Sequence, residues 1–185
     1  MSEQRPRAWR IISSAYPIAT PFLRLRADRV ELPSGAVVED YYVRESRGFS
    51  VVFALTPDDL VVLVRQYKHG IAEIVTELPA GGVDAGESPA ECAVRELAEE
   101  TGYAGGPPVL VRSFTTDPTN SNSRFHLFVI RDAVRVGEPQ PDLTEEIEVL
   151  LASRAEVRAM ALDGRIAAGS QVAAVLTALE FLSAP

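Results

Sequence analysis

The chain of 185 residues lacks features that mark several classes of protein. Its one cysteine, Cys92, excludes an internal disulfide, and its two histidines, His69 and His126, are not at ligand spacing, so neither is interpreted as a catalyst. Charges such as Arg65 interrupt every apolar run before the about 18 residues that span a bilayer. The first residues also lack the apolar stretch of a signal peptide. We therefore expect a soluble, cytoplasmic protein with no membrane partner.

Positive charge is also scarce. Lysine and arginine number 18 against 26 acidic residues, which leaves a formal net charge of −8. The basic field that attracts nucleic-acid backbones is therefore missing, and no nucleic-acid partner is expected. Hydrophobic residues make up 46% of the chain, enough to bury the core of one domain of about 100–200 residues.

Alternating and continuous apolar patterns predict strands along most of the chain. The expected strands cover residues 22–32, 36–43, 48–55, 60–67, 74–78, 109–116, 124–133 and 146–152. The first two form a hairpin around the turn residues Pro33-Ser34-Gly35. Two helices are expected near the C-terminus, over 153–162 and 170–182. We divide the chain into an N-terminal β extension, residues 1–47, and a main domain, residues 48–185.

A further helix is marked by signals at both of its ends. Ser88 suits the N-cap, and Glu91, three residues later, completes a capping box. Pro89 suits the first helical position, and Gly102 suits the C-terminal cap.

The two faces of this helix differ in chemistry. The stripe expected to pack on the core consists of Ala90, Ala93, Val94 and Leu97. On the opposite face, Glu96, Glu99 and Glu100 are neighbours, so their charges repel one another. Cys92 shares this face and is interpreted as a small filler. One interpretation is a solvated face paired through Arg95, and the other is a site for Mg²⁺, which prefers oxygen ligands.

The wider spacing decides between these interpretations. The positions that carry it are Gly81, Glu87, Arg95, Glu96, Glu99, Glu100 and Gly102, followed by Tyr103. They match every fixed position of GX5EX7REUXEEXGU, so residues 81–103 resemble the Nudix box, in which U is a bulky apolar residue. The segments VRQYKHG (64–70), TELPAGG (76–82) and EEIEV (145–149) are similar to the ADP-ribose and nucleoside-diphosphate-sugar pyrophosphatase branch of that family.

The resemblance implies an α/β fold, the Nudix α/β/α sandwich with a mixed sheet between helices, preceded by antiparallel N-terminal strands. It implies an enzyme that hydrolyses the pyrophosphate bond of a nucleoside diphosphate sugar, such as ADP-ribose, to a nucleoside monophosphate and a sugar phosphate. The implied cofactor is Mg²⁺, with Mn²⁺ as an alternative, and the N-terminal strands imply a homodimer. Two other functions stay open: hydrolysis of a nucleoside triphosphate or dinucleotide polyphosphate, and nucleotide sensing without catalysis.

Site residues follow from the resemblance, position by position. The implied metal ligands are the Ala80 carbonyl, Glu96, Glu100, Glu99 and, as a supporting group, Glu87. Arg95 is expected to orient these glutamates. The general base is expected in the acidic loop over 139–149, where the candidates are Asp142, Glu145, Glu146 and Glu148. Alignment of the Glu-Glu-Ile sequence favours Glu145 as the base, with Glu146 next.

Four residues are expected to contact substrate. Arg65 and Gln66 follow a buried strand and can grip a phosphate, although a solvated strand end explains them equally well. Glu77 either bonds a base or ribose or pairs with Arg65. Arg124 ends the polar loop over 117–123, which suits sugar hydroxyls or a second phosphate, or else forms an Asx turn.

Overall fold

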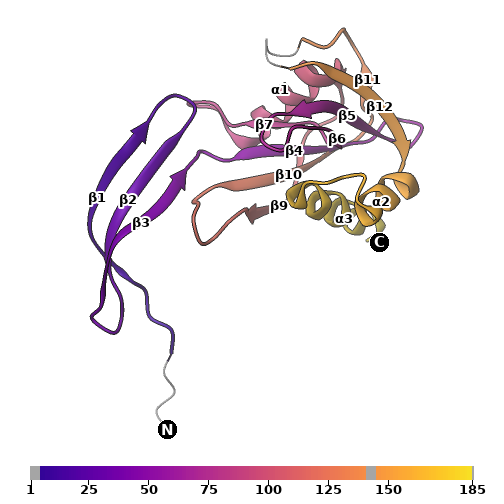
Figure 1. The fold of residues 1–185 in the computed structure, drawn as a ribbon. Helices are drawn as coiled ribbons and strands as arrows, with labels where there is room; N and C mark the ends of the chain where they lie inside the picture. The colour runs from indigo at the N-terminus through magenta and orange to yellow at the C-terminus, as the bar shows by residue number, and fades with distance from the viewer. Residues whose placement is uncertain (1–4, 141–144, 185) are drawn as a thin grey trace. The chain divides into compact units, whose positions relative to one another are not determined.

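The computed structural model describes residues 5–140 and 145–184, which form two compact units (Figure 1). The N-terminal unit contains the residues up to Ser46 together with Thr115–Ser123. The main unit contains Arg47–Phe114 and the chain from Arg124 onward.

The N-terminal unit is an antiparallel sheet of three strands in the order β1-β2-β3. Its strands are β1 (Arg10–Ala19), β2 (Arg24–Glu31) and β3 (Val37–Glu45). The β2–β3 pair confirms the expected hairpin, and Gly35 in its turn has φ 86°, a left-handed conformation that favours glycine. Strand β1 is absent from the sequence expectations.

A buried charged network holds this sheet together. Asp28 is 2% exposed, and its carboxylate accepts hydrogen bonds from Arg26 at 2.9 Å and from the Ser14 hydroxyl at 2.6 Å. Arg26 also binds Glu45 at 2.5 Å, and Arg24 binds the same carboxylate at 2.7 Å. The arginine beside it is the main reason that the pKa of Asp28 is lowered.

The main unit contains two sheets, a short ribbon and three helices. Its elements are β4 (Phe49–Ala54), β5 (Leu60–Lys68), β6 (Glu73–Glu77), β7 (Ala80–Gly82), α1 (Pro89–Thr101), β8 (Tyr103–Ala104), β9 (Val109–Thr115), β10 (Arg124–Ile130), β11 (Val134–Arg135), β12 (Ile147–Ser153), α2 (Arg154–Asp163) and α3 (Gly169–Ser183). One sheet has the order β7-β4-β10-β9, the other has the order β12-β5-β6, and β8 pairs with β11. Because β4 is parallel to β10 and antiparallel to β7, the first sheet is mixed.

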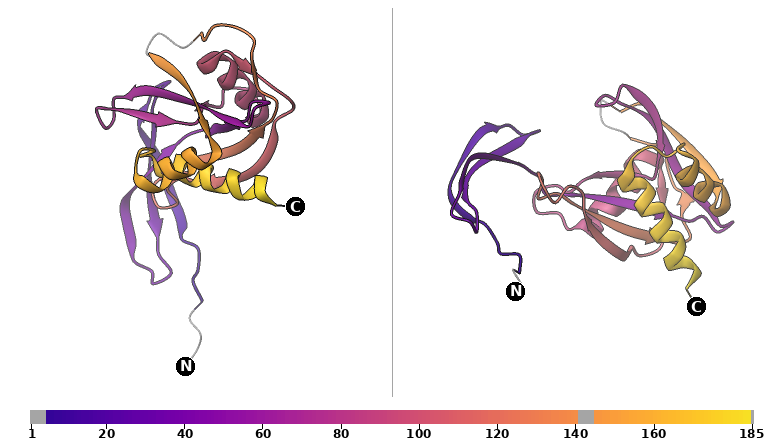
Figure 2. Two further views of the ribbon diagram at one scale, coloured as in Figure 1. Left: turned by 90° about the vertical axis from the view of Figure 1, so that its right-hand side faces the viewer. Right: turned by 60° about the horizontal axis from the view of Figure 1, so that its bottom comes forward.

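Helices cover both faces of these sheets (Figure 2). Leu97 of α1 packs with Val52 and Phe128, whereas Val157 of α2 and Val175 of α3 belong to the larger core on the other side. This arrangement confirms the expected α/β class, with a mixed sheet between helices. Within the described residues, no helix has the length and apolar character to cross a membrane.

Candidate active site

Helix α1 carries most of the expected site residues, and its ends form as expected. The Ser88 hydroxyl accepts the N–H of Glu91 at 3.3 Å, and the Glu91 carboxylate accepts the N–H of Ser88 at 2.8 Å. This reciprocal pair confirms the capping box. Gly102 ends the helix with φ 72°, and its N–H donates to the Ala98 carbonyl. The helix is therefore fixed at the two ends that bracket the glutamates.

The burial of α1 differs from the expected single stripe. Leu97 packs in the core, but Val94 is 44% exposed, so its expected place in the core stripe is wrong. In contrast, Cys92, Glu96 and Glu100 are buried, because β7 and β5 contact that side of the helix. Two acids of this face, Glu96 and Glu100, are therefore enclosed by protein, whereas the side chain of Glu99 is 46% exposed.

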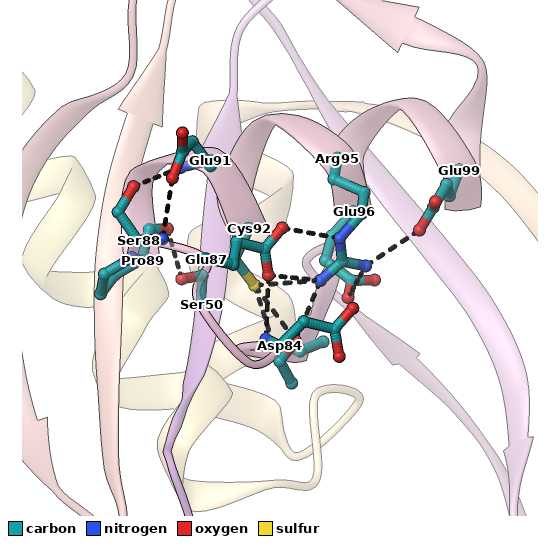
Figure 3. Close-up of polar contacts among 12 residues, drawn as sticks. Ser50, Asp84, Glu87, Ser88, Pro89, Glu91, Cys92, Arg95, Glu96 and Glu99 are labelled. Atoms are coloured by element: carbon teal, nitrogen blue, oxygen red, sulfur yellow. Dashed lines mark hydrogen bonds and ion pairs between the residues drawn. The ribbon is translucent and has the colours of Figure 1, made fainter.

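Arg95 lies at the centre of the acidic cluster (Figure 3). Its guanidinium donates to Glu87 at 2.8 Å, to Glu96 at 2.7 Å and to Glu99 at 3.0 Å. It also donates to the Gly82 carbonyl at 3.0 Å, which ties α1 to β7. The hydrogen bond from Arg95 is the largest cause that lowers the pKa of Glu87 to about 2. These contacts orient three glutamates around the guanidinium of Arg95.

The close approach of β7 to α1 depends on Gly81. A Cβ atom on this residue would clash with both carboxylate oxygens of Glu96. The Cys92 thiol donates to the carbonyls of Gly81 and Gly82 at 3.4 Å each, in line with its expected role as a small filler. Glycine is therefore needed at position 81 so that the backbone can lie against the carboxylate of Glu96.

Among the acids that the structure describes, Glu100 is the most deeply buried, with 1% of its surface exposed. One carboxylate oxygen accepts the N–H of Ala80 at 2.9 Å, and the other lies 3.4 Å from the amide nitrogen of Gln66. Burial raises the pKa of Glu100 to about 8, and the charges of Glu96 and Glu145 act in the same direction. Burial also raises the pKa of Glu96. Glu96 and Glu100 therefore need additional positive charge nearby to stabilise their deprotonated forms.

The donor set fits a hard divalent cation by its chemistry. Within the described residues, no three His, Cys, Asp or Glu side chains are gathered at metal-binding distances. Arg95 holds Glu96 and Glu99, while the Ala80 N–H holds Glu100. All three carboxylates are nevertheless carried by one helix within five residues, and oxygen ligands of this kind are those that Mg²⁺ and Mn²⁺ bind.

The strand register sorts the residues near β5 into two faces. Directly paired residues of neighbouring strands project to the same face. Gln66 contacts Glu100, so Gln66 and Lys68, two residues later, are on the α1 face. Ile147 of β12 is paired with Gln66 and shares that face. Arg65, one residue before Gln66, projects away from α1 by the alternation of the strand.

This division changes the expected substrate contacts. Arg65 pairs with Glu148 at 2.5 Å on the face away from α1. Glu77 pairs instead with Lys68 at 3.3 Å, so the expected alternative in which Glu77 pairs with Arg65 is wrong. Gln66 is 5% exposed and points toward Glu100, which suits support of that carboxylate better than contact with a substrate.

Lys68 ends the same strand but is not among the four substrate contacts predicted from the sequence. Its charge acts on Glu100, lowering the pKa of that acid against the larger effect of burial. Two-residue alternation along Arg65-Gln66-Tyr67-Lys68 places Lys68 on one face with Gln66. That alternation is the signal that identifies it once the face of Gln66 is known.

The candidate bases in the acidic loop have different surroundings. Glu145 lies close enough to Glu96 and Glu100 for its charge to raise the pKa of both. Glu146 lines a surface cavity of about 290 Å³ with residues of both faces, among them Arg65 and Glu148 but also Gln66 and Ile147. The candidate Asp142 lies outside the described residues.

The polar loop before β10 has a structural role in the N-terminal unit. The Asp117 carboxylate accepts the N–H of Thr119 at 3.1 Å and that of Asn120 at 3.2 Å, which is the Asx turn expected as one alternative. The carbonyl of Asn120 accepts the N–H of Arg44 on β3 at 2.8 Å. In the main unit, Arg124 starts β10, and its carbonyl lies against Gly48.

Similarity to known proteins agrees with this geometry. Residues 45–173 match the NUDIX domain, and residues 9–43 match the nucleoside diphosphate sugar hydrolase N-terminal domain. A crystal structure described as an ADP compounds hydrolase superposes with a TM-score of 0.83 at 20% identity, covering 97% of this chain and 96% of that chain. At this identity the superposition shows a shared fold.

Two curated relatives show similarity in sequence. The methanol dehydrogenase activator of Bacillus methanolicus is 37% identical over 109 residues, covering 59% of this chain and 58% of the relative. The ADP-ribose pyrophosphatase of Bacillus subtilis is 31% identical over 128 residues, covering 68% of each. The chain spans about half the length of several other relatives that it matches. With the NUDIX domain matched over most of its length, the chain belongs to the Nudix family.

Proposed function

We propose that the chain is a metal-dependent hydrolase that cleaves the pyrophosphate bond of a nucleoside diphosphate sugar of the ADP-ribose kind. The products would be a nucleoside monophosphate and a sugar phosphate. The observation that carries the proposal is the enclosed acid cluster: Glu96 and Glu100 are buried on α1, Arg95 braces the first, and Glu145 lies at their edge. Uncompensated acids repel an anionic diphosphate. A bound cation is therefore required for the acids and the diphosphate to lie close together.

The relatives support the substrate class. One of them is named ADP-ribose pyrophosphatase, and another, from mouse, is named ADP-sugar pyrophosphatase. The match of residues 9–43 to the N-terminal domain of nucleoside diphosphate sugar hydrolases favours a nucleotide sugar over a nucleoside triphosphate.

The acids of α1 would hold the metal. Glu96, Glu99, Glu100 and the Ala80 backbone would bind Mg²⁺, with Mn²⁺ as an alternative, while Glu87 stays bound to Arg95. When bound, the cation neutralises the diphosphate and lowers the pKa of the attacking water. Helix α1, capped at both ends and packed on the core through Leu97, keeps the ligands in place.

Glu145 would serve as the general base. Its charge acts on both buried glutamates, whereas Glu146 lines a surface cavity with Arg65 and Glu148. A base must come within about 2.6–3.2 Å of the water it deprotonates, which favours the residue beside the metal ligands.

Lys68 would bind a phosphate of the substrate. It is on the α1 face, is 41% exposed at its side chain, and is held by Glu77 at 3.3 Å. An ammonium group in this position meets the diphosphate as a point charge. Arg65 is paired with Glu148 on the other face and is a weaker candidate for this contact.

The N-terminal unit would form a homodimer. Its strands and the segments beside them leave large apolar side chains exposed, namely Trp9, Ile11, Tyr16, Ile18, Phe22, Leu23, Val37 and Tyr42. Surfaces of this composition are typical of protein interfaces. A mass of one chain by light scattering at working concentration would contradict the dimer. For the cell, we propose the cytoplasm, where a lone buried thiol such as that of Cys92 stays reduced.

A turnover panel tests the function. ADP-ribose, other nucleotide sugars, nucleoside triphosphates and dinucleotide polyphosphates are incubated with the full chain, with and without Mg²⁺ or Mn²⁺, and the products are identified. We expect metal-dependent cleavage of a nucleotide sugar and its loss in Glu100→Gln, which keeps the helix caps. Preference for a triphosphate would contradict the substrate class, and nucleotide binding without any turnover would indicate a sensor.

A further inference from the structure

The side chain of Gln171, in the first turn of α3, is bonded to the main chain of Leu78. Its amide oxygen accepts the N–H of Leu78 at 3.1 Å, and its amide nitrogen donates to the Leu78 carbonyl at 3.2 Å. Both residues are buried, with 4% of Gln171 and 0% of Leu78 exposed. The primary amide therefore exchanges two hydrogen bonds with one residue, as a paired residue of an antiparallel strand does.

This contact lies between two strand ladders. The pairing of β6 with β5 ends at Glu77, and the pairing of β7 with β4 begins at Ala80, so Leu78 and Pro79 lie between them. Buried main-chain polar groups outside a ladder need another partner. The side chain of Gln171 is that partner for both polar groups of Leu78.

Residues 78–80 are bonded to three different elements of the main unit. The first of them is bonded to Gln171 of α3. The carbonyl of Pro79 accepts an N–H of β4 at 2.9 Å. Ala80 donates its N–H to the carboxylate of Glu100 on α1 at 2.9 Å. The contact with Gln171 lies outside the acid cluster, so a substitution can remove it without changing a proposed metal ligand.

The main chain of Ala80 follows closely from that of Leu78. The two residues are separated only by Pro79, whose ring fixes φ at about −65°. Because the Pro79 carbonyl is also bonded to β4, few rotations remain between them. A shift of the Leu78 main chain would therefore move the Ala80 N–H relative to Glu100.

We propose that Gln171 is a positioning residue, whose two bonds to the Leu78 main chain place the Ala80 N–H on the carboxylate of Glu100 and so fix the geometry of the proposed metal site. The kinetic consequence rests on the proposed function. A purely structural role, in which Gln171 only joins α3 to the core, would affect stability alone.

Gln171→Met removes both hydrogen bonds and keeps a side chain of similar length. Val157→Ala in α2 is the matched control, because it removes buried methyl groups from the core cluster that also contains Leu78, and it leaves Gln171 unchanged. In the metal-free chains we measure hydrogen exchange of the Leu78 and Ala80 amides, at the same interval below each thermal midpoint. The affinity for Mn²⁺ is measured by calorimetry, and kcat and KM are measured with ADP-ribose.

We expect the Ala80 amide to exchange at least about tenfold faster in Gln171→Met than in Val157→Ala, because its bond to Glu100 opens locally. The Mn²⁺ affinity and kcat should each fall about tenfold, the lower end of the loss when a group that orients a metal ligand is removed, while KM changes by less than about twofold. Val157→Ala should lower the thermal midpoint and leave the Mn²⁺ affinity and kcat near those of the wild type. Equal Ala80 exchange, Mn²⁺ affinity and kcat in the two variants would overturn the proposal.

The proposed function and the role of Gln171 can fail separately. If the wild-type chain turns over no nucleotide sugar, the proposed function fails, and the exchange of the Ala80 amide in the two variants still decides the role of Gln171. If Gln171→Met does not fold, the wild-type chain decides. Equal protection of the Leu78 and Ala80 amides, corrected for their intrinsic exchange rates, would then support the proposal, and a Leu78 amide that exchanges faster than that of Ala80 would refute it.

Discussion

Gly81 and Glu96 are packed so closely that no side chain fits between the backbone of the one and the carboxylate of the other. The next residue, Gly82, has open space where a Cβ would lie. The two adjacent glycines therefore have different roles: the first gives the Glu96 carboxylate room to lie on the strand, and the carbonyl of the second accepts a hydrogen bond from Arg95.

Gly81→Ala should displace the Glu96 carboxylate, because the added methyl group occupies its place. A displacement of about 1 Å in a catalytic group costs on the order of 100-fold in rate, so we expect kcat/KM to fall by about that factor. Steady-state kinetics at saturating Mg²⁺ measures the loss. Gly82→Ala is the matched control and should stay within about threefold of wild type. Equal activity in the two variants would contradict the packing argument.

Glu145→Gln should lower kcat by about 100-fold or more, the usual contribution of a general base, with a smaller change in KM. Glu146→Gln changes the neighbouring acid, which lines a surface cavity with Arg65 and Glu148, and should retain most of the activity. The pair has the same change in charge, so the comparison isolates position. A larger loss in the Glu146 variant would move the base to that residue.

Lys68→Met should raise KM by about tenfold, because a charged contact to phosphate is lost while the aliphatic stem is kept. Arg65→Met removes a charge from the other face of β5 and should change KM by less than about twofold. Initial rates over a range of substrate concentrations separate the two. A larger rise in KM for Arg65→Met than for Lys68→Met would instead assign the phosphate contact to Arg65.

Asp28→Asn should destabilise the N-terminal unit by about 2 kcal/mol at neutral pH, because buried hydrogen bonds to Arg26 and Ser14 lose the charge of their acceptor. The folded-state pKa of Asp28 is below its ordinary value of 3.8. Its contribution is therefore complete above that pH and is lost as the pH falls through the lower folded-state pKa. The difference in unfolding free energy between the variant and the wild type should shrink over the same pH range.

Denaturant unfolding followed by the fluorescence of Trp9 measures this effect. Trp9 is the one tryptophan in the chain and lies 5.4 Å from the ring of Tyr41, centroid to centroid, within the same unit. Glu39→Gln, which removes an exposed acid paired with Arg29, is the control and should leave the midpoint nearly unchanged. A pH-independent loss in Asp28→Asn would refute the charge-based explanation.

Local signals in the sequence predict the elements whose formation depends on local chemistry. The Ser88 and Gly102 caps, the hairpin turn at Gly35 and the apolar strands β4 and β5 all form where their residues indicate. Short strands such as β7 and β8 have too few residues for a periodic pattern, and they exist because a distant strand pairs with them.

The burial of α1 shows why the site is only partly predictable. Helical periodicity indicates which residues share a face, but it does not indicate how many faces other elements cover. Val94 has the hydrophobicity of a core residue and is exposed, whereas Glu100 is charged and buried. Similarly, the faces of Arg65 and Lys68 are assigned only when the register with β6 and β12 is known.

The loop over 115–123 has a consequence for how the chain can be divided. Arg44 of β3 donates its N–H to Asn120 and accepts the N–H of Asn122, so the N-terminal unit is completed by a segment that enters the sequence about 70 residues later. Cutting the chain before residue 47 would remove the hydrogen-bond partners that β3 gives to this loop. The excised strands would in turn lose the loop. Exchanging this unit between relatives would therefore require two grafts, the first three strands and this loop, transferred together.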